Sequence, residues 1–212
     1  PSLASGDNTI YMYYANASAI TASNGDNTFA FFDDFLGTTL NTVKWDVLNV
    51  PANVTVSGGI CTITGHASVP VIKGKTFFST NYAIRFRYSP SAVGGANIQA
   101  GWYDTSKYLI IYGSVTAGQS SYTCCNTSEV RQYFAGDTSY HIYDIIRNGS
   151  VNTLCYRDNQ YMFTNNTQVP TVDMKPTFVN AAAGTTENID WVFVRKYNAT
   201  EPTSSFGAEQ NN

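Results

Sequence analysis

Short runs of alternating apolar and polar residues, separated by turn residues, dominate this chain. In Tyr82–Tyr88 (YAIRFRY), aromatic and aliphatic residues occupy every second position and the two arginines fall between them. A period of two predicts a half-buried β-strand. The dipeptide Asn148-Gly149 separates two further runs, Tyr140–Arg147 and Ser150–Tyr156. It predicts a β-hairpin, because both residues tolerate a positive φ.

The other candidate strands lie along the whole chain and are short. They are Thr9–Tyr14, Phe29–Phe35, Val54–Val56, Gly59–Thr64, Val69–Ile72, Asn97–Tyr103, Tyr108–Tyr112, Ser120–Cys125, Val130–Phe134, Tyr161–Thr164 and Ile189–Tyr197. We find no internal repeat and no helical periodicity beyond about one turn. Many short strands with frequent turns predict an all-β sandwich or jelly roll of two antiparallel sheets.

Composition supports the all-β prediction and argues against nucleic acid and a membrane as partners. Charged residues make up 13% of the chain, about half the usual share, and aromatic residues make up 14%. The net charge of −3 and the pI near 5.2 give no basic footprint for nucleic acid. No run of about 18 apolar residues is present, so we expect no membrane span. The opening Pro1-Ser2-Leu3 fits a processed or excised protein.

The cysteines bear on the cellular compartment. They are Cys61, Cys124, Cys125 and Cys155, without a C-x-x-C motif, and the two histidines lie far apart, so we expect no zinc site. On a strand, Cys124 and Cys125 would point to opposite faces. This favours separate partners for them, Cys61 and Cys155, in two disulfides. Such disulfides would imply an oxidising compartment. Buried free thiols are the alternative.

N-x-S/T sequons indicate the same compartment. They begin at Asn16, Asn53, Asn126, Asn148, Asn165 and Asn198. Asn148 lies in the predicted hairpin turn and Asn198 follows the last predicted strand, so a glycan could be attached at both. We therefore expect an N-glycosylated, extracellular or cell-surface protein.

Three segments resemble a known family. Phe31–Trp45 (FFDDFLGTTLNTVKW), Tyr140–Ser150 (YHIYDIIRNGS) and Ile189–Tyr197 (IDWVFVRKY) resemble concanavalin A-like, laminin-G-type domains of archaeal and bacterial surface proteins. Asn8–Phe35 resembles the C-terminal end of an uncharacterised domain that precedes such modules. The resemblance covers roughly residues 8–200. It implies a concanavalin-like jelly roll and display at an archaeal or bacterial surface.

This resemblance and the strand pattern suggest a division of the chain. Residues 1–28 would hold an N-terminal strand (9–14) and a linker, residues 29–198 the β-sandwich, and residues 199–212 a polar tail.

Catalysis is not expected. Laminarinase-like hydrolases share the implied architecture and carry a Glu-x-Asp-x-x-Glu strand, which this sequence lacks. A glycosidase needs two carboxylates beside one bond. Glu187 and Asp190 are three residues apart, which puts them on opposite faces of a strand. His141 is expected to be an ordinary strand residue.

The cofactor that the sequence suggests is one structural calcium ion. Related sandwiches often hold Ca²⁺ between the first and last strands, and Asp33, Asp34 and Asp190 occupy the corresponding positions. The alternative is that Asp190 only hydrogen-bonds a neighbouring turn.

A carbohydrate site would need exposed aromatic side chains beside amide and hydroxyl groups. The candidates are Trp102, Tyr103, Tyr108, Tyr112 and Tyr133. Trp45 and Trp191 lie in the family motifs, so we expect them in the core, together with most tyrosines.

Self-assembly is the remaining option. The aromatic N-terminal strand comprises Ile10, Tyr11, Met12, Tyr13 and Tyr14, and a small-residue linker follows it. Such a strand can dock on its own sheet or add to a neighbour's sheet edge, which would build a head-to-tail filament.

The sequence therefore favours a non-catalytic, extracellular structural or adhesive protein, with a filament subunit joined by strand donation as one form of it. Its partners would be further copies of itself and N-linked glycans. A carbohydrate-binding, lectin-like module of a larger surface protein, with polysaccharide as partner, is the alternative.

Overall fold

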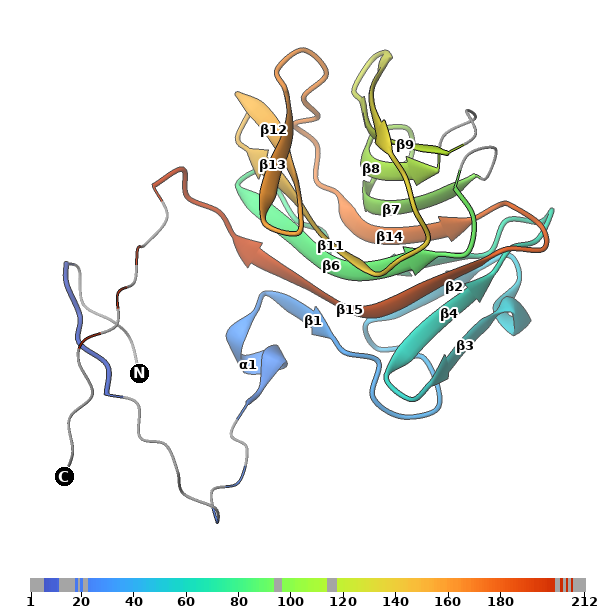
Figure 1. Cartoon of the computed structure of the whole chain (residues 1–212), viewed down its shortest axis with the longest axis horizontal. Coiled ribbons are helices and arrows are strands. Elements are labelled where there is room, and N and C mark those ends of the chain that lie inside the picture. Colours follow the sequence, from blue (N-terminus) through green and yellow to red (C-terminus); the bar gives the residue numbers. More distant parts are fainter. Residues whose placement is uncertain are drawn as a thin grey trace.

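The protein is a two-layer β-sandwich (Figure 1). The computed structural model describes residues 6–11, 18, 20, 23–93, 97–113, 118–200, 203, 205 and 207. Two antiparallel sheets pack face to face around one core that takes side chains from both. The predicted all-β jelly-roll class is confirmed.

The larger sheet has eight strands, and seven of them follow the order β13-β12-β11-β6-β15-β4-β3, while β1 pairs with β15. Their bounds are β1 Phe31–Asp33, β3 Val54–Ser57, β4 Ile60–Thr64, β6 Tyr82–Pro90, β11 His141–Asn148, β12 Asn152–Arg157, β13 Gln160–Asn165 and β15 Thr186–Lys196.

The smaller sheet has seven strands in the order β10-β9-β8-β7-β14-β5-β2. Their bounds are β2 Trp45–Leu48, β5 Val71–Gly74, β7 Ile98–Tyr103, β8 Tyr108–Gly113, β9 Gln119–Cys125, β10 Glu129–Ala135 and β14 Lys175–Asn180. The helical elements are a turn of α-helix, α1 (Gly25–Thr28), and a 3-10 turn, η1 (Pro51–Asn53). Neither helix in the described part of the chain has the length or apolar character to span a membrane.

The predicted hairpin is confirmed. β11 and β12 pair antiparallel as far as Asn148 opposite Asn152, and Gly149 takes a φ of 58° in the turn. Among the residues described at the N-terminus, Thr9, Ile10 and Tyr11 form no strand, whereas Met12, Tyr13 and Tyr14 lie outside the described residues.

Two strands were not predicted from the sequence, β2 and β14. β14 is central in its sheet, between β7 and β5, although it contains Pro176. Proline donates no hydrogen bond and is expected at sheet edges, so the sequence argues against a strand here. The flanking Thr177 and Phe178 are nevertheless buried, and this burial explains the placement of β14.

The core is aromatic and is anchored by one buried carboxylate. The ring of Trp45 meets Phe31 edge-on at 5.0 Å between centroids. Its indole Nε1 donates to Asp33 Oδ2 at 2.7 Å, and Asp33 Oδ1 accepts the Phe35 N–H at 2.8 Å. The second bond holds Phe35 at a φ of 51°, which non-glycine residues seldom adopt.

Arg147 is the largest charged side chain in the core. It is fully buried on β11, and its guanidinium lies 5.7 Å from the ring centroid of Trp102 on β7. Its two terminal nitrogens donate to backbone carbonyl oxygens of Phe78, Ser79, Pro170 and Val172. Burial lowers the pKa of Arg147 to about 10, so the group remains charged at neutral pH. The side chain thus ties together the connections that lead into β6 and β14.

We expect Arg147→Met to lower the free energy of unfolding by about 3 kcal/mol, because it leaves buried carbonyl groups without a donor. Chemical denaturation followed by tryptophan fluorescence measures this. Arg87→Met is the matched control, since Arg87 forms a half-exposed ion pair with Asp190 and should cost at most about 1 kcal/mol. Equal stability of the two variants would contradict the role assigned to Arg147.

Candidate functional site

The outer face of the seven-stranded sheet carries large polar and aromatic side chains. Along β8, Leu109 and Ile111 are fully buried in the core, whereas Tyr108 and Tyr112 are half-buried and point the other way. The same alternation on β10 puts Arg131 on this face, because it pairs with Thr123 of the neighbouring strand β9, which lines the same pocket.

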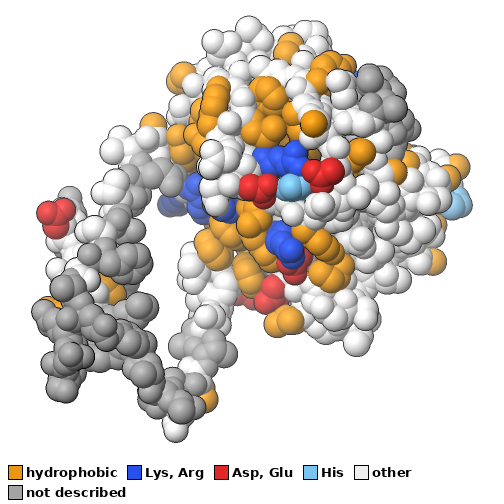
Figure 2. Space-filling model, in the orientation of Figure 1, with side chains coloured by type: hydrophobic (Ala, Val, Ile, Leu, Met, Phe, Trp, Pro, Cys, Tyr) orange, Lys and Arg blue, Asp and Glu red, His pale blue; other side chains and the backbone are white. Residues whose placement is uncertain are grey.

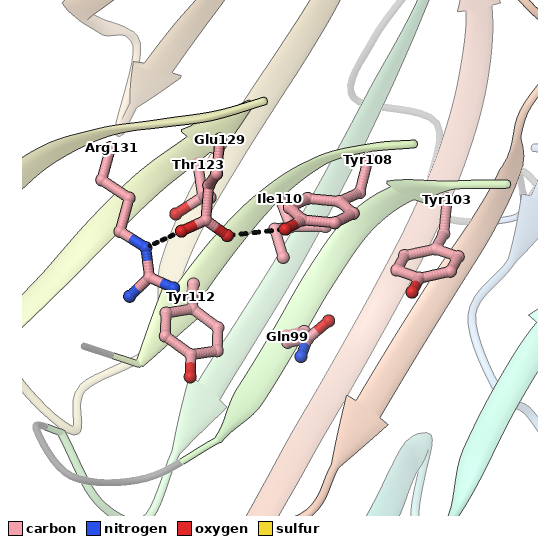
Figure 3. Close-up of a pocket in the computed structure, with 8 residues that line it drawn as sticks. All are labelled: Gln99, Tyr103, Tyr108, Ile110, Tyr112, Thr123, Glu129 and Arg131. Atoms are coloured by element: carbon pink, nitrogen blue, oxygen red, sulfur yellow. Dashed lines mark hydrogen bonds and ion pairs between the residues drawn. The ribbon is translucent and has the colours of Figure 1, made fainter. Parts of the chain in front are cut away.

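These side chains enclose an open pocket of about 230 Å³ (Figure 3). Its lining comprises Gln99, Tyr103, Tyr108, Ile110, Tyr112, Thr123, Glu129 and Arg131. Thr123 lies opposite Ile110 on one side and Arg131 on the other, so these three residues form one row across three strands. The outward residues of β9 are small, Ser121 and Thr123, whereas β8 and β10 carry long side chains. The lining residues come from β7, β8, β9 and β10, so the pocket extends over these four neighbouring strands.

Glu129 is the acidic group of the pocket. Its Oε2 accepts the Tyr108 hydroxyl at 2.6 Å, and its Oε1 accepts Arg131 Nε at 2.5 Å (Figure 3). Burial alone would raise the pKa of Glu129, but the hydrogen bonds from Arg131 and Tyr108 hold it below its usual value. Burial and the bond to Glu129 raise the pKa of Tyr108. At neutral pH, an ionised carboxylate thus lies between a neutral phenol and a guanidinium.

Two aromatic contacts complete the pocket. Tyr103 and Tyr108 are cross-strand neighbours whose rings stack at 5.6 Å with an interplanar angle of 10°. The Arg131 guanidinium lies 4.7 Å from the ring centroid of Tyr112. Stacked aromatic faces beside hydroxyl, amide and charged groups suit a ligand that has both apolar C–H faces and many hydroxyls.

The structure brings together part of the predicted carbohydrate set. Tyr103, Tyr108 and Tyr112 line the pocket, and Tyr133 is 48% exposed on the same face of β10. Trp102, in contrast, is fully buried, and its Nε1 donates to the Ile145 carbonyl at 3.0 Å.

Trp191 also differs from its expectation, since it is not in the core. It is half-buried on the outer face of the larger sheet, where it stacks on Phe193 at 5.6 Å. Trp45 is buried as expected. Gln99, Glu129 and Arg131 also line the pocket, although the sequence did not predict them there. The alternation of Glu129, Arg131 and Tyr133 along β10 was a signal for one shared face.

The three aspartates considered for calcium have different surroundings. Both carboxylate oxygens of Asp33 are engaged with Phe35 and Trp45, and Asp190 pairs with Arg87. Asp34 follows Asp33 in the sequence and is half-buried. Within the described residues, no group of three metal-ligating side chains converges. The calcium site stays a prediction.

The predicted disulfides are not formed. All four cysteines are free thiols, and Cys61, Cys124 and Cys155 are buried. Cys124 points into the core from β9, whereas Cys125 is half-buried on the opposite face of the strand, as the alternation predicted. Because neighbouring residues of a strand diverge in this way, the pair cannot serve one common partner.

The sequons differ in accessibility. Asn198 is exposed, and Asn53, Asn126 and Asn148 are half-buried. Asn165 is 4% exposed, donates to the Gln168 carbonyl and accepts from the Thr167 N–H, so its amide is not accessible for a glycan in the folded protein. Asn16 lies outside the described residues. Glycosylation of the other sites stays a prediction.

An ionic cluster lies away from the pocket, where β11 begins. Figure 2 shows acidic, basic and histidine side chains gathered on one face, flanked by hydrophobic groups. His141 Nδ1 lies 2.6 Å from Asp158 Oδ2, and its Nε2 lies 2.9 Å from Asp137 Oδ1. Arg157 also pairs with Asp137. Both ring nitrogens are engaged, which fits the expected structural role of His141.

The N-terminal part of the chain is similar to one family. Residues 1–48 match a family described as "Domain of unknown function (DUF2341)". This match extends beyond the N-terminal segment through β1 and β2. No curated protein matches the sequence significantly.

Several solved structures share the fold. One, from a study of endo-acting O-glycanases with which human gut bacteria initiate mucin breakdown, is 14% identical with a TM-score of 0.66, covering 80% of this chain and 100% of its own. The β-glucanase of Bacillus licheniformis is 14% identical with a TM-score of 0.65, covering 78% and 97%. A pseudo-β-1,3-glucanase and immunostimulatory antigen of Mycobacterium tuberculosis is 15% identical with a TM-score of 0.63, covering 80% and 99%.

These neighbours correct the function expected from the sequence. The expectation of a non-catalytic structural or filament protein is contradicted, because many of the solved structures that share the fold are glycoside hydrolases. The lack of a Glu-x-Asp-x-x-Glu strand was too narrow a criterion, since it tested only carboxylates on one strand. The findings agree better with the alternative, carbohydrate binding.

Glu187 is a second acidic residue with an unusual environment. It is fully buried on β15, opposite Ile63, and in the part of the chain described neither carboxylate oxygen has a hydrogen-bond partner. Burial raises the pKa of Glu187 well above its usual value. The folded protein therefore keeps a proton that the unfolded chain releases above about pH 4.

We expect Glu187 to stabilise the folded protein most at acidic pH, where it is protonated. Its contribution to the free energy of unfolding should fall as the pH rises above about 4, by at most about 1.4 kcal/mol per pH unit. Glu187→Gln should remove this slope, which denaturant unfolding at a series of pH values measures. Glu129→Gln is the control and should retain it. An unchanged pH profile in Glu187→Gln would contradict the assignment.

Proposed function

We propose that the outer face of the seven-stranded sheet binds a glycan or polysaccharide chain, with the pocket around Glu129 at the centre of the site. The observation that carries this proposal is the stacked pair Tyr103–Tyr108 beside the Glu129–Arg131 ion pair. A pyranose ring could pack its C–H face on the tyrosines while its hydroxyls meet charged partners, which form stronger hydrogen bonds than neutral ones.

The site is preformed. The ring stack and the two hydrogen bonds of Glu129 hold these side chains against one another, so binding would order few of them, which favours affinity. The face also extends beyond the pocket. From β10 to β5 it crosses five strand spacings, or roughly 24 Å. This length suits an extended chain of several sugar rings better than a single sugar.

The known neighbours support the same ligand class. They include a β-glucanase, a pseudo-β-1,3-glucanase and a structure from a study of endo-acting O-glycanases that initiate mucin breakdown, all of which concern saccharides. An extracellular or cell-surface location, which the sequons suggest, would give the chain access to such polymers. The finer resemblance to laminin-G-type domains of archaeal surface proteins fits this setting and is part of the proposal.

We expect the wild-type protein to bind soluble β-1,3-glucan or mucin-type O-glycans in isothermal titration calorimetry. Tyr108→Ala should weaken binding about tenfold, because it removes half of the aromatic stack and the hydroxyl bonded to Glu129. Tyr161→Ala is the matched control, since Tyr161 is 58% exposed on β13 of the other sheet. Equal affinities of the two variants would refute the proposed site.

A second candidate function is cleavage of the bound glycan. It is favoured by the glycoside hydrolases among the neighbours and by the ionised state of Glu129, which suits a base or nucleophile. Among the residues that line the pocket, Glu129 is the only carboxylate. The usual two-carboxylate scheme would therefore need a second acid from outside this lining.

If the chain cleaves glycans, reducing ends should accumulate from β-1,3-glucan or mucin glycopeptides. Glu129→Gln should lower this rate at least ~100-fold while the affinity changes much less. Arg195→Gln, on the larger sheet, serves as control. A wild-type protein that binds without turnover would reject cleavage and leave binding as the function.

A further inference from the structure

Two lysines lie beside the pocket, next to Tyr103 and on the side away from Glu129. Lys175 on β14 lies directly opposite Tyr103 of β7. Lys73 on β5 lies opposite Thr177, two residues along β14, and so shares the outer face. Lys73 Nζ is 5.6 Å from the ring centroid of Tyr103. The Lys175 Nζ is 4.3 Å from the ring centroid of Phe77, which is 54% exposed.

Neither ammonium group has an anionic partner at bonding distance. In the described parts of the chain, Lys73 and Lys175 form no ion pair, and their contacts are with aromatic rings. Lys75, on the same side of the sheet, does have an anionic neighbour. Its Nζ donates to the Thr42 carbonyl at 2.6 Å and lies 3.5 Å from Asp46 Oδ1.

The two charges also act on each other. Burial and the like charge of Lys175 lower the pKa of Lys73, and Asp104, in the turn after β7, opposes this only as the smallest of the three influences. Desolvation and mutual repulsion disfavour the charged forms of these two lysines. A bound anion would favour the charged forms, because an opposite charge nearby acts against both effects.

The opposite end of the pocket, around Glu129 and Arg131, carries no net positive charge. Glu129 and Arg131 neutralise each other there, and an added anion would be repelled by the Glu129 carboxylate. From β10 to β14, four strand spacings separate this pair from Lys175, roughly 19 Å. The site therefore has a neutral end that suits sugar hydroxyls and a cationic end that suits an acidic group.

We infer that the ligand of this face is an anionic glycan, whose carboxylate or sulfate group is bound by Lys73 and Lys175 while neighbouring rings pack on Tyr103 and Tyr108. This inference rests on the proposed glycan-binding function and specifies its ligand class. A neutral glucan would leave both ammonium groups uncompensated beside the bound chain.

The experiment compares charged glycans with matched neutral ones by calorimetry at low ionic strength. Hyaluronan provides carboxylates and carboxyl-reduced hyaluronan is its neutral counterpart, whereas keratan sulfate and its desulfated form test sulfate. We expect at least one charged probe to bind about tenfold tighter than its counterpart. Added salt should reduce this difference, because it screens exposed charges.

The double variant Lys73→Gln/Lys175→Gln should lose the preference for the charged probe and keep the affinity for its neutral form. Lys196→Gln, at the end of β15 on the other sheet, should keep the preference. Equal binding of charged and neutral probes by the wild type, or a preference that survives the double variant, would overturn the anionic ligand and leave glycan binding in place. Failure of every probe, including β-1,3-glucan, to bind would overturn both proposals.

Discussion

The buried guanidinium of Arg147 connects the two sheets to the loops between them. It leaves β11 of the larger sheet, lies beside the ring of Trp102 in the smaller one, and donates to carbonyls that precede β6 and β14. A buried cation without a carboxylate partner is costly unless its donors are satisfied. Here backbone carbonyls satisfy its two terminal nitrogens, so the connections must keep one conformation. That conformation holds the connection into β14, which presents Lys175 to the outer face directly opposite Tyr103 of β7.

The pocket arises from the pairing of three strands rather than from a loop. β9 lies between β8 and β10 and places Cys125 opposite both Tyr108 and Glu129. Tyr108 and Glu129 are 21 residues apart in sequence, yet this register brings their side chains within 2.6 Å. The inward residues of the same strands, such as Leu109 and Tyr122, are fully buried in the core. The rigidity of the core therefore extends directly to the site, and the side chains that would meet a ligand are held in place beforehand.

The sequence predicted the fold well and the site only in part, for physical reasons. Alternation identifies strands and the Asn148-Gly149 turn, because both are local. It does not identify β14, since Pro176 opposes a central strand and only burial from distant residues explains it. The face of each strand was also uncertain: Trp102 and Tyr103 are adjacent, and a shift of one residue exchanges core and surface. The meeting of Glu129 with Tyr108 depends on sheet register, which no local motif contains.

The few charged residues of this chain show how strongly position determines chemistry. Glu187 and Glu129 are the same residue type, yet burial raises the pKa of Glu187, while Tyr108 and Arg131 hold that of Glu129 low. Of these two glutamates, only Glu129 can therefore present an ionised carboxylate to a ligand at neutral pH. The spacing of acidic residues along the sequence does not distinguish a carboxylate in the core from one on the surface. The sheet separates them, because each strand directs alternate residues to the dry core and to the open face. The proposed function therefore depends on which face a side chain occupies, and the outer face of the seven-stranded sheet brings together tyrosines, an ion pair and two lysines without an ion-pair partner among the described residues.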